Sequence, residues 1–228
     1  MIYAFVNPDP LLLDDPDVSA SPLATGVVQM LRDAELIPVT GRDELQLLEV
    51  PAAFTSWQIL LYGAVVLTPE GAEEEGWRRL THDIQARHGS AVILAAQAIE
   101  HISMFGQLEL EVELVERGGS PLLVRVAHPH QLELALRQAA ADWQTWIDDG
   151  PFAAHLRLVQ DGLTLIVLPR ELGTDGAVNY VMNALSDLDL SVGVGARESD
   201  RAFLALCDLT IIPGNTAWLE RTTIELED

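Results

Sequence analysis

Short apolar runs alternate with helical patterns over the first 85 residues of the chain. The first run, Ile2–Val6, is uninterrupted, and two more apolar runs lie at residues 36–39 and 57–67. The segments between and after these runs place apolar side chains at helical spacing, at residues 23–31, 42–49 and 72–85. Strand and helix in alternation predict a parallel β-sheet, with residues 57–67 as its third strand.

A different pattern begins near residue 86. Residues 108–116 and 122–127 alternate between apolar and polar positions around the Gly-rich turn at 117–121. A second pair of runs, 153–159 and 163–169, flanks Asp161-Gly162. Both arrangements are typical of β-hairpins. With the helical periodicity of residues 130–148 between them, the order αββαββ is predicted, an antiparallel layer inserted into a parallel α/β chain.

The first pattern returns near Leu168. Helical and apolar strand patterns follow each other again, at residues 176–185, 190–195, 199–206 and 209–213. The chain therefore predicts two domains. We place a discontinuous α/β core at residues 1–85 and 167–228, and an inserted domain at residues 86–166.

The composition is that of a globular protein. The chain has 228 residues, 49% of them hydrophobic, which is enough for one large core or two smaller ones. Its apolar stretches are too short or too interrupted to span a bilayer, and no basic region precedes the first apolar run, so we expect a cytoplasmic protein. The single Cys207 excludes a disulfide framework and is predicted to be a buried core residue.

The charge is strongly acidic. The net charge is −22, and all 13 basic residues are arginine, because the sequence contains no lysine. A field of this sign repels phosphate backbones and anionic lipids. Since no local basic patch is evident, we expect binding neither to nucleic acid nor to a membrane.

Two polar residues stand where the first strand ends. In FVNPDPLLLDD, Asn7 and Asp9 alternate with prolines, which remove backbone donors and force an extended, turning path. Ligands of open α/β sheets bind at the carboxyl ends of the strands. Asn, Asp and Pro are also ordinary turn residues, and this stretch alone does not separate the two interpretations.

Four motifs, taken in order, give the chain a resemblance to a known family. They are Thr40 at the end of the second strand, Tyr62-Gly63-Ala64 after the third, GAVNYVMNAL from Gly176, and GVGARESDRAFLALCDLTIIPGN from Gly193. This set resembles the haloacid dehalogenase superfamily of phosphatases, in particular members with a C2-type cap. The resemblance implies a Rossmann-like core with a parallel sheet and an inserted αββαββ cap.

The resemblance also implies roles for the residues that follow the first and second strands. Asn7 stands at the position of the aspartate nucleophile, which attacks phosphorus as a carboxylate and binds magnesium; a carboxamide can do neither. Asp9 matches the general acid and base. Thr40 matches a hydroxyl that binds a phosphate oxygen, and Gly41 and Arg42 follow it as in the Thr-Gly-Arg form of capped members.

The later motifs depart from the family pattern at two positions. Asp175 stands where the family has a lysine, and Ala196 replaces the first carboxylate of Gly-Asp-x-x-x-Asp. Asp200 retains the second carboxylate, the metal position of the motif. Arg197 lies beside the altered position and is a candidate, with Arg170, for the missing positive charge, although a guanidinium does not replace an ammonium ion neatly.

Two functions remain open from the sequence. In the first, the protein is a pseudophosphatase, without catalysis or cofactor, that binds a phosphorylated small molecule or a partner protein through Thr40, Gly41, Arg42, Asp175 and Arg197. In the second, Asp9, Asp200 and an arginine sustain a divergent, magnesium-dependent sugar-phosphate hydrolysis. We favour the first, because the loss of one member of a catalytic unit typically lowers the rate about 10⁴- to 10⁶-fold.

The histidines give no metal signature. His82, His88 and the pair His128 and His130 have neither a CxxC partner nor HExxH spacing. We therefore predict that they are turn and surface residues.

Overall fold

The computed structural model describes residues 1–9, 29–50, 52–148 and 150–212. The chain divides into two compact units. Unit 1 comprises Met1–Arg78 and Gly173–Asp228, and unit 2 comprises Arg79–Leu172. The boundaries predicted at residues 85 and 167 lie a few residues from these, inside a long helix and a strand respectively. The helix predicted at residues 23–31 lies largely outside the described residues.

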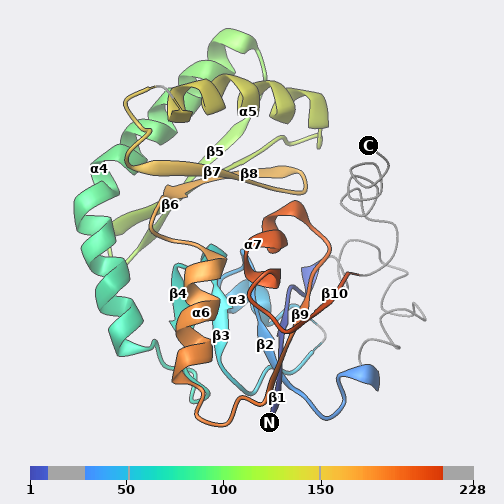
Figure 1. Ribbon diagram of the computed structural model, residues 1–228. Coiled ribbons are helices and arrows are strands. Elements are labelled where there is room, and N and C mark those ends of the chain that lie inside the picture. Colours follow the sequence, from blue (N-terminus) through green and yellow to red (C-terminus); the bar gives the residue numbers. More distant parts are fainter. Residues whose placement is uncertain (10–28, 51, 149, 213–228) are drawn as a thin grey trace. The chain divides into compact units, whose positions relative to one another are not determined.

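Unit 1 is built on a four-stranded parallel sheet (Figure 1). Its strands, in the order β10-β9-β1-β2, are Leu209–Ile211, Leu190–Val194, Ile2–Val6 and Glu35–Pro38. β1 pairs in parallel with β2 on one side and β9 on the other. Its residues from Tyr3 to Val6 are all buried, as expected for a central strand covered on both faces, whose sequence is continuously apolar.

The prediction of one strand over residues 57–67 is wrong. The segment forms an antiparallel pair, β3 (Gln58–Leu60) and β4 (Val65–Leu67), joined by a 3-10 turn over Leu61–Gly63. Only one parallel bridge, between Val39 and Ile59, connects β3 to the chain following β2. The chain reverses because Leu61, Tyr62 and Gly63 adopt positive φ angles of 48°, 58° and 87°.

Short helices complete unit 1. They are α3 (Glu44–Leu47), α6 (Thr174–Ala184), a 3-10 turn over Glu198–Asp200 and α7 (Arg201–Leu204). Ala177, Val178 and Val181 of α6 and Phe203 of α7 are buried with Phe5 of β1 in one hydrophobic core. Cys207 is partly buried beside this core, and burial raises the pKa of its thiol to about 12.

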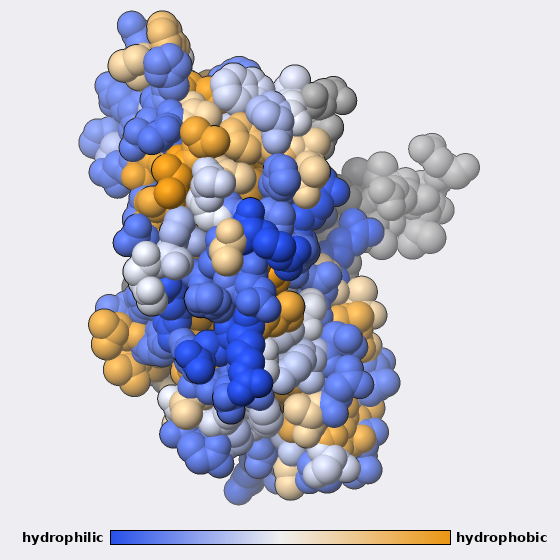
Figure 2. Space-filling model, turned by 90° about the vertical axis from the view of Figure 1, so that its left-hand side faces the viewer, coloured by the Kyte–Doolittle hydropathy of each residue, from blue (hydrophilic) through white to orange (hydrophobic). Residues whose placement is uncertain are grey.

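The longest helix continues past its predicted end at residue 85. α4 runs from Glu75 to Gly106, and the boundary between the units falls within it. Its buried positions in unit 2 keep a spacing of three and four residues, at Val92, Ala95, Ala96 and Ile99. Ile93, Leu94, Met104 and Phe105 of α4 are exposed apolar side chains. Figure 2, seen from the side of Figure 1 on which α4 lies, shows hydrophobic patches among hydrophilic residues.

Unit 2 carries the predicted αββαββ order. Its antiparallel sheet has the order β5-β6-β8-β7, with the strands at Glu111–Arg117, Ser120–Ala127, Thr164–Pro169 and Leu156–Asp161. α5 (Glu133–Asp148) buries Leu136, Trp143 and Ile147 in the core of unit 2, whereas Leu132, just before the helix, is exposed. The predicted class, a parallel α/β core with an inserted antiparallel α+β domain, is confirmed.

Among the described helices, none combines the length and the apolar character that crossing a bilayer requires.

Candidate functional site

The candidate site lies where three parallel strands of unit 1 end. Asn7 follows β1, and its backbone N–H donates to the carbonyl of Val194, the last residue of β9, at 2.8 Å. On the other side, Val39 donates to the carbonyl of Val6, also at 2.8 Å. The sheet therefore brings the residues after β1, β2 and β9 to the same edge, where α/β sheets bind ligands.

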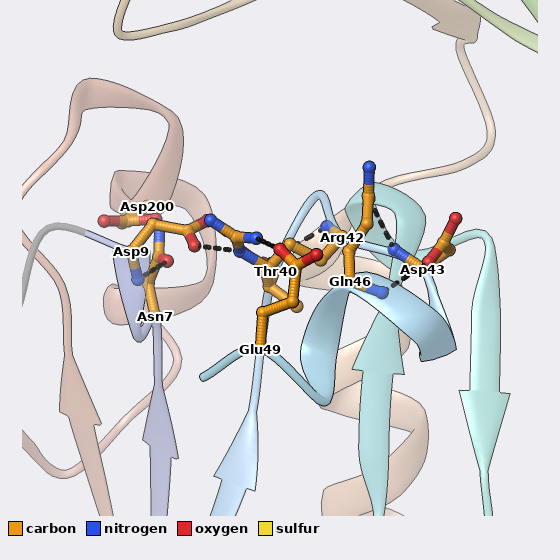
Figure 3. A network of polar contacts seen from close by, with 8 residues as sticks. All are labelled: Asn7, Asp9, Thr40, Arg42, Asp43, Gln46, Glu49 and Asp200. Carbon is orange, nitrogen blue, oxygen red and sulfur yellow. Dashed lines mark hydrogen bonds and ion pairs between the residues drawn. The ribbon is translucent and has the colours of Figure 1, made fainter. Parts of the chain in front are cut away.

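Asn7 and Asp200 form the centre of this edge (Figure 3). The Nδ2 group of Asn7 donates a hydrogen bond to Oδ1 of Asp200 at 2.7 Å. Both side chains are buried, with exposed fractions of 4% and 3%. The Oδ1 atom of Asn7 accepts from the backbone N–H of Asp9, so the amide contacts both neighbouring acidic residues.

Asp200 is held from its other side by backbone. Its Oδ2 atom accepts from the N–H groups of Ala196 and Arg197, each at 2.9 Å. Gly195 makes this approach feasible, because a Cβ there would lie 2.6 Å from the same oxygen. The carboxylate thus accepts hydrogen bonds from one side-chain amide and two backbone N–H groups.

Asp9 is bound by the residues that follow β2. Nε of Arg42 donates to its Oδ1 at 2.5 Å, and the hydroxyl of Thr40 donates to its Oδ2 at 3.1 Å. The Arg42 guanidinium also lies 3.6 Å from Glu49. The backbone N–H of Arg42 donates to the Thr40 hydroxyl, which fixes the orientation of that side chain. The result is a partly buried ion pair with a hydroxyl at its edge.

The turn over Leu61–Gly63 supports this loop. Tyr62 donates its backbone N–H to the carbonyl of Thr40, and Leu61 donates to that of Arg42. Gly41 packs directly under the ring of Tyr62, since a Cβ at position 41 would lie 2.2 Å from the ring. These contacts stabilise the positive φ angles of the turn, which are unfavourable for Leu and Tyr.

The same turn connects the loop to the beginning of α6. A Cβ on Gly63 would lie 2.3 Å from the carbonyl oxygen of Gly173, the residue that precedes α6. Asp175 is in the first turn of this helix, where a carboxylate interacts favourably with the helix dipole. Asp175 therefore has a structural reason to be acidic, independent of any ligand.

The structure brings five of the eight predicted residues into one bonded network, namely Asn7, Asp9, Thr40, Arg42 and Asp200. Arg197 joins through its backbone N–H, Gly41 lies between two members, and Asp175 lies at the start of the neighbouring helix.

The carboxylate oxygens at this site are poorly suited to bind the magnesium ion that the fold family implies. Mg²⁺ takes six oxygen ligands in near-octahedral geometry, with carboxylates as its protein ligands. Here both oxygens of Asp200 accept hydrogen bonds, Asp9 is paired with Arg42, and position 196 has no carboxylate. Among the described residues, no group of three or more His, Cys, Asp or Glu side chains is arranged for a metal ion.

The sequence interpretation missed three contributors. Tyr62 was noted only as part of the Tyr62-Gly63-Ala64 motif and was given no role, and its contact with Gly41 depends on the reversal of the chain. Glu49 was only part of a helical pattern. Gln46 forms a capping box with Asp43, which fixes the start of α3 directly after Arg42. An Asp followed three residues later by Gln is a pattern from which that cap could have been predicted.

Comparison with solved structures identifies the fold. The chain matches the Synechocystis sucrose-phosphatase, solved with sucrose and phosphate, with a TM-score of 0.62 and 15% identity, over 100% of this chain and 87% of that one. It matches an IMP-bound mutant of Plasmodium falciparum IMP-nucleotidase with a TM-score of 0.61 and 13% identity, over 99% and 67%. A haloacid dehalogenase-like hydrolase from B. subtilis gives 0.53 and 15%, over 93% and 95%.

The chain thus has the fold of the haloacid dehalogenase-type phosphatases, a Rossmann-like core with an inserted cap, as the sequence predicted. No family profile and no curated protein sequence matches the chain. At these identities the likeness concerns the fold, and function depends on the site itself.

Proposed function

We propose that this protein is a pseudophosphatase that binds a phosphorylated ligand, a small molecule or a modified protein, without hydrolysing it. The ligand site is the edge of the unit 1 sheet formed by Asn7, Asp9, Thr40, Arg42 and Asp200. We expect it to act in the cytoplasm and to need no metal ion.

The hydrogen bond between Asn7 and Asp200 is the observation that carries this proposal. At 2.7 Å it is short for an amide donor, as expected where the acceptor is charged. The amide occupies the position at which the resemblance places a nucleophilic carboxylate, and it has no charge with which to attack phosphorus. The N–H group of the same amide donates a hydrogen bond to Asp200, the residue that the resemblance gives as a metal ligand.

Arg42 is the group best suited to bind a phosphoryl group. The guanidinium is 25% exposed, and its planar head has donors besides the Nε that binds Asp9, so it can reach a ligand oxygen without leaving the ion pair. Arginine binds phosphate oxygens well because its donors match their geometry. The retained Arg42 therefore supports phosphate recognition, although the chemistry next to it has changed.

One observation favours a second candidate, a divergent magnesium-dependent sugar-phosphate phosphatase. Asp9 is buried, and both of its oxygens are oriented, by Thr40 and by Arg42. An oriented carboxylate at this position could activate a water molecule directly against phosphorus, without a covalent intermediate. The experiment below separates the two candidates.

The test combines binding and turnover on the same preparation. Phosphate release is measured with millimolar Mg²⁺ from p-nitrophenyl phosphate, glucose 6-phosphate, sucrose 6-phosphate and IMP, the last two because of the similar folds. Binding of each ester is measured by calorimetry. We expect at least one ester to bind and none to be hydrolysed.

Matched variants identify the site. Arg42→Gln should abolish binding, whereas Arg201→Gln should preserve it. Arg201 is 63% exposed and pairs with Glu198, so its substitution removes the same charge from unit 1 outside the network. Magnesium-dependent turnover that Asp9→Ala abolishes would establish the second candidate instead. A folded protein with neither binding nor turnover would contradict both.

A further inference from the structure

Two histidines of unit 2 face each other through the same ring atom. His88 lies on α4, and His155 immediately precedes β7. Their Nδ1 atoms are 3.3 Å apart, and their ring centroids are 5.3 Å apart at an interplanar angle of 52°. His88 is buried, which corrects its prediction as a turn or surface residue, and His155 is exposed.

A carboxylate lies at the other nitrogen of His88. Oε2 of Glu171 is 2.7 Å from Nε2 of His88, a close contact between a carboxylate and an imidazole nitrogen. The other oxygen of Glu171 accepts from Arg87 at 2.6 Å. Burial raises the pKa of Glu171, but the hydrogen bond and charge of Arg87, with the contribution of His88, outweigh this effect and lower it overall.

The contact with Glu171 selects one tautomer of the neutral His88 ring. The carboxylate of Glu171 lies 2.7 Å from Nε2 and favours an N–H at that atom, so the lone pair remains on Nδ1, the atom that lies 3.3 Å from Nδ1 of His155. A second pair, His128 and His130, does not have such an available Nδ1 lone pair at both rings. There the Nδ1 atom of His128 already accepts the backbone N–H of His130, which leaves it no lone pair for another partner.

Two ring nitrogens at this separation match the ligands of one metal ion. Zinc binds imidazole nitrogen at about 2.0–2.1 Å in tetrahedral geometry, which places two such nitrogens about 3.3–3.4 Å apart. An N–H···O hydrogen bond is typically about 2.9–3.0 Å long, so 3.3 Å is long for a direct bond between the rings. Metal-binding histidines commonly direct their second nitrogen at a carboxylate, as His88 does at Glu171.

We propose that His88 and His155 chelate one zinc-class divalent cation through their Nδ1 atoms, with Glu171 positioning His88. The other coordination positions are taken by water, because Glu171 lies on the far side of the His88 ring. The cation would join α4 to the segment before β7 within unit 2.

Two neutral imidazole rings bind the cation without net proton release. His88 offers its Nδ1 lone pair directly. His155, if it carries its proton on Nδ1, transfers it through solvent to its own Nε2, and its Nδ1 lone pair then binds the metal. Imidazole is a good ligand for zinc, nickel and copper. We expect a site with two imidazole nitrogens to bind Cu²⁺ more tightly than Zn²⁺.

The test is titration of the full chain with ZnCl₂ at about 0.15 M salt, where loose association with the acidic surface is screened. Calorimetry and the imidazole nitrogen NMR signals are recorded together. We expect one site per chain, with shifts confined to the signals of His88 and His155. His155→Ala should abolish the site, and Glu171→Gln should weaken it about 10- to 100-fold.

His82→Ala is the matched control, because His82 is an exposed histidine of α4 that also lies beside an acidic residue, Asp83. It should leave zinc binding unchanged. The proposal is overturned if His155→Ala binds zinc as wild type does, if His82→Ala loses the site equally, or if wild type shows no shift of either ring at millimolar zinc. In the last case, the contact is only a long hydrogen bond between the rings.

Discussion

Replacement of Asn7 by Asp tests the organisation of the site in a single step. The change introduces a carboxylate where the proposed function infers a lost nucleophile, but it removes the donor to Asp200 and places two carboxyl groups at the 2.7 Å separation that the amide now bridges. Neither group has much access to water, because both residues are buried. The variant should therefore fold less stably unless a cation is added.

The loss of stability in Asn7→Asp is set by the protonation state of the carboxylate pair that has the lower free energy. The two states are a pair of ionised carboxylates and a pair in which one carboxylate is protonated. Two ionised carboxylates about 3 Å apart repel by about 5–6 kcal/mol at an effective dielectric constant of about 20. Protonating one of them at pH 7 costs about 4 kcal/mol, because a free Asp titrates near about 3.9 and each pH unit is worth about 1.4 kcal/mol. The pair will share a proton, so we expect a loss of up to about 4 kcal/mol at pH 7 and about 1.5 kcal/mol at pH 5.

The assay is urea denaturation of wild type and Asn7→Asp at both pH values, with and without 10 mM MgCl₂. Asn179→Asp makes the same chemical change at an exposed position of α6 and should change the free energy of unfolding by less than about 0.5 kcal/mol. Magnesium should stabilise Asn7→Asp and not wild type, since only the variant offers paired carboxylates. Equal stability of Asn7→Asp and wild type at pH 7 without magnesium would refute the reasoning.

Three further substitutions test the surroundings of the site. Gly41→Ala should lower the free energy of unfolding by about 1–3 kcal/mol, because the new Cβ would overlap the Tyr62 ring; an unchanged urea midpoint would argue against that packing. The hydrogen bond to Glu74, together with burial, raises the pKa of Tyr180 from 10.0 to about 12, so its contribution to stability is complete below pH 10 and is lost as the pH rises toward 12. Tyr180→Phe should therefore lose less stability than wild type between pH 9 and pH 11, and parallel pH profiles would contradict this. Phe203→Ala should cost about 3–5 kcal/mol, because this ring is completely buried, and a loss below about 1 kcal/mol would mean that the core around α7 collapses to fill the space.

The strands of the sheet could be predicted because their sequences reflect burial on both faces. Ile2–Val6 is apolar throughout and occupies the centre of the sheet, with the predicted bounds. Residues 57–67 are equally apolar, but an apolar run is the same for one long strand and for two short strands around a tight turn. Leu61 and Tyr62 are poor turn formers, and their positive φ angles depend on hydrogen bonds to residues 40 and 42 that no local pattern reveals.

The positions of the site residues could be anticipated, but their mutual bonds could not. Motif order indicated that Asn7 and Asp200, 193 residues apart, would be neighbours, and their side chains are bonded. The sequence interpretation assigned Arg42 to a ligand, whereas its Nε pairs with Asp9. The direction in which a long side chain folds back is decided by the charges around it in space, and these become neighbours only when the sheet forms.

The most direct measurement of the central claim is magnesium-dependent hydrolysis of p-nitrophenyl phosphate by wild type and by the triple variant Asn7→Asp, Asp175→Lys, Ala196→Asp. The triple variant restores the nucleophile, the counter-charge and the metal ligand together, and catalytic groups that act as a unit recover non-additively. We predict no magnesium-dependent release by wild type, little by Asn7→Asp alone, and clear turnover by the triple variant. Turnover by wild type at the rate of an ordinary phosphatase, or a folded triple variant that neither binds magnesium nor releases nitrophenol, would contradict the assignment of this site.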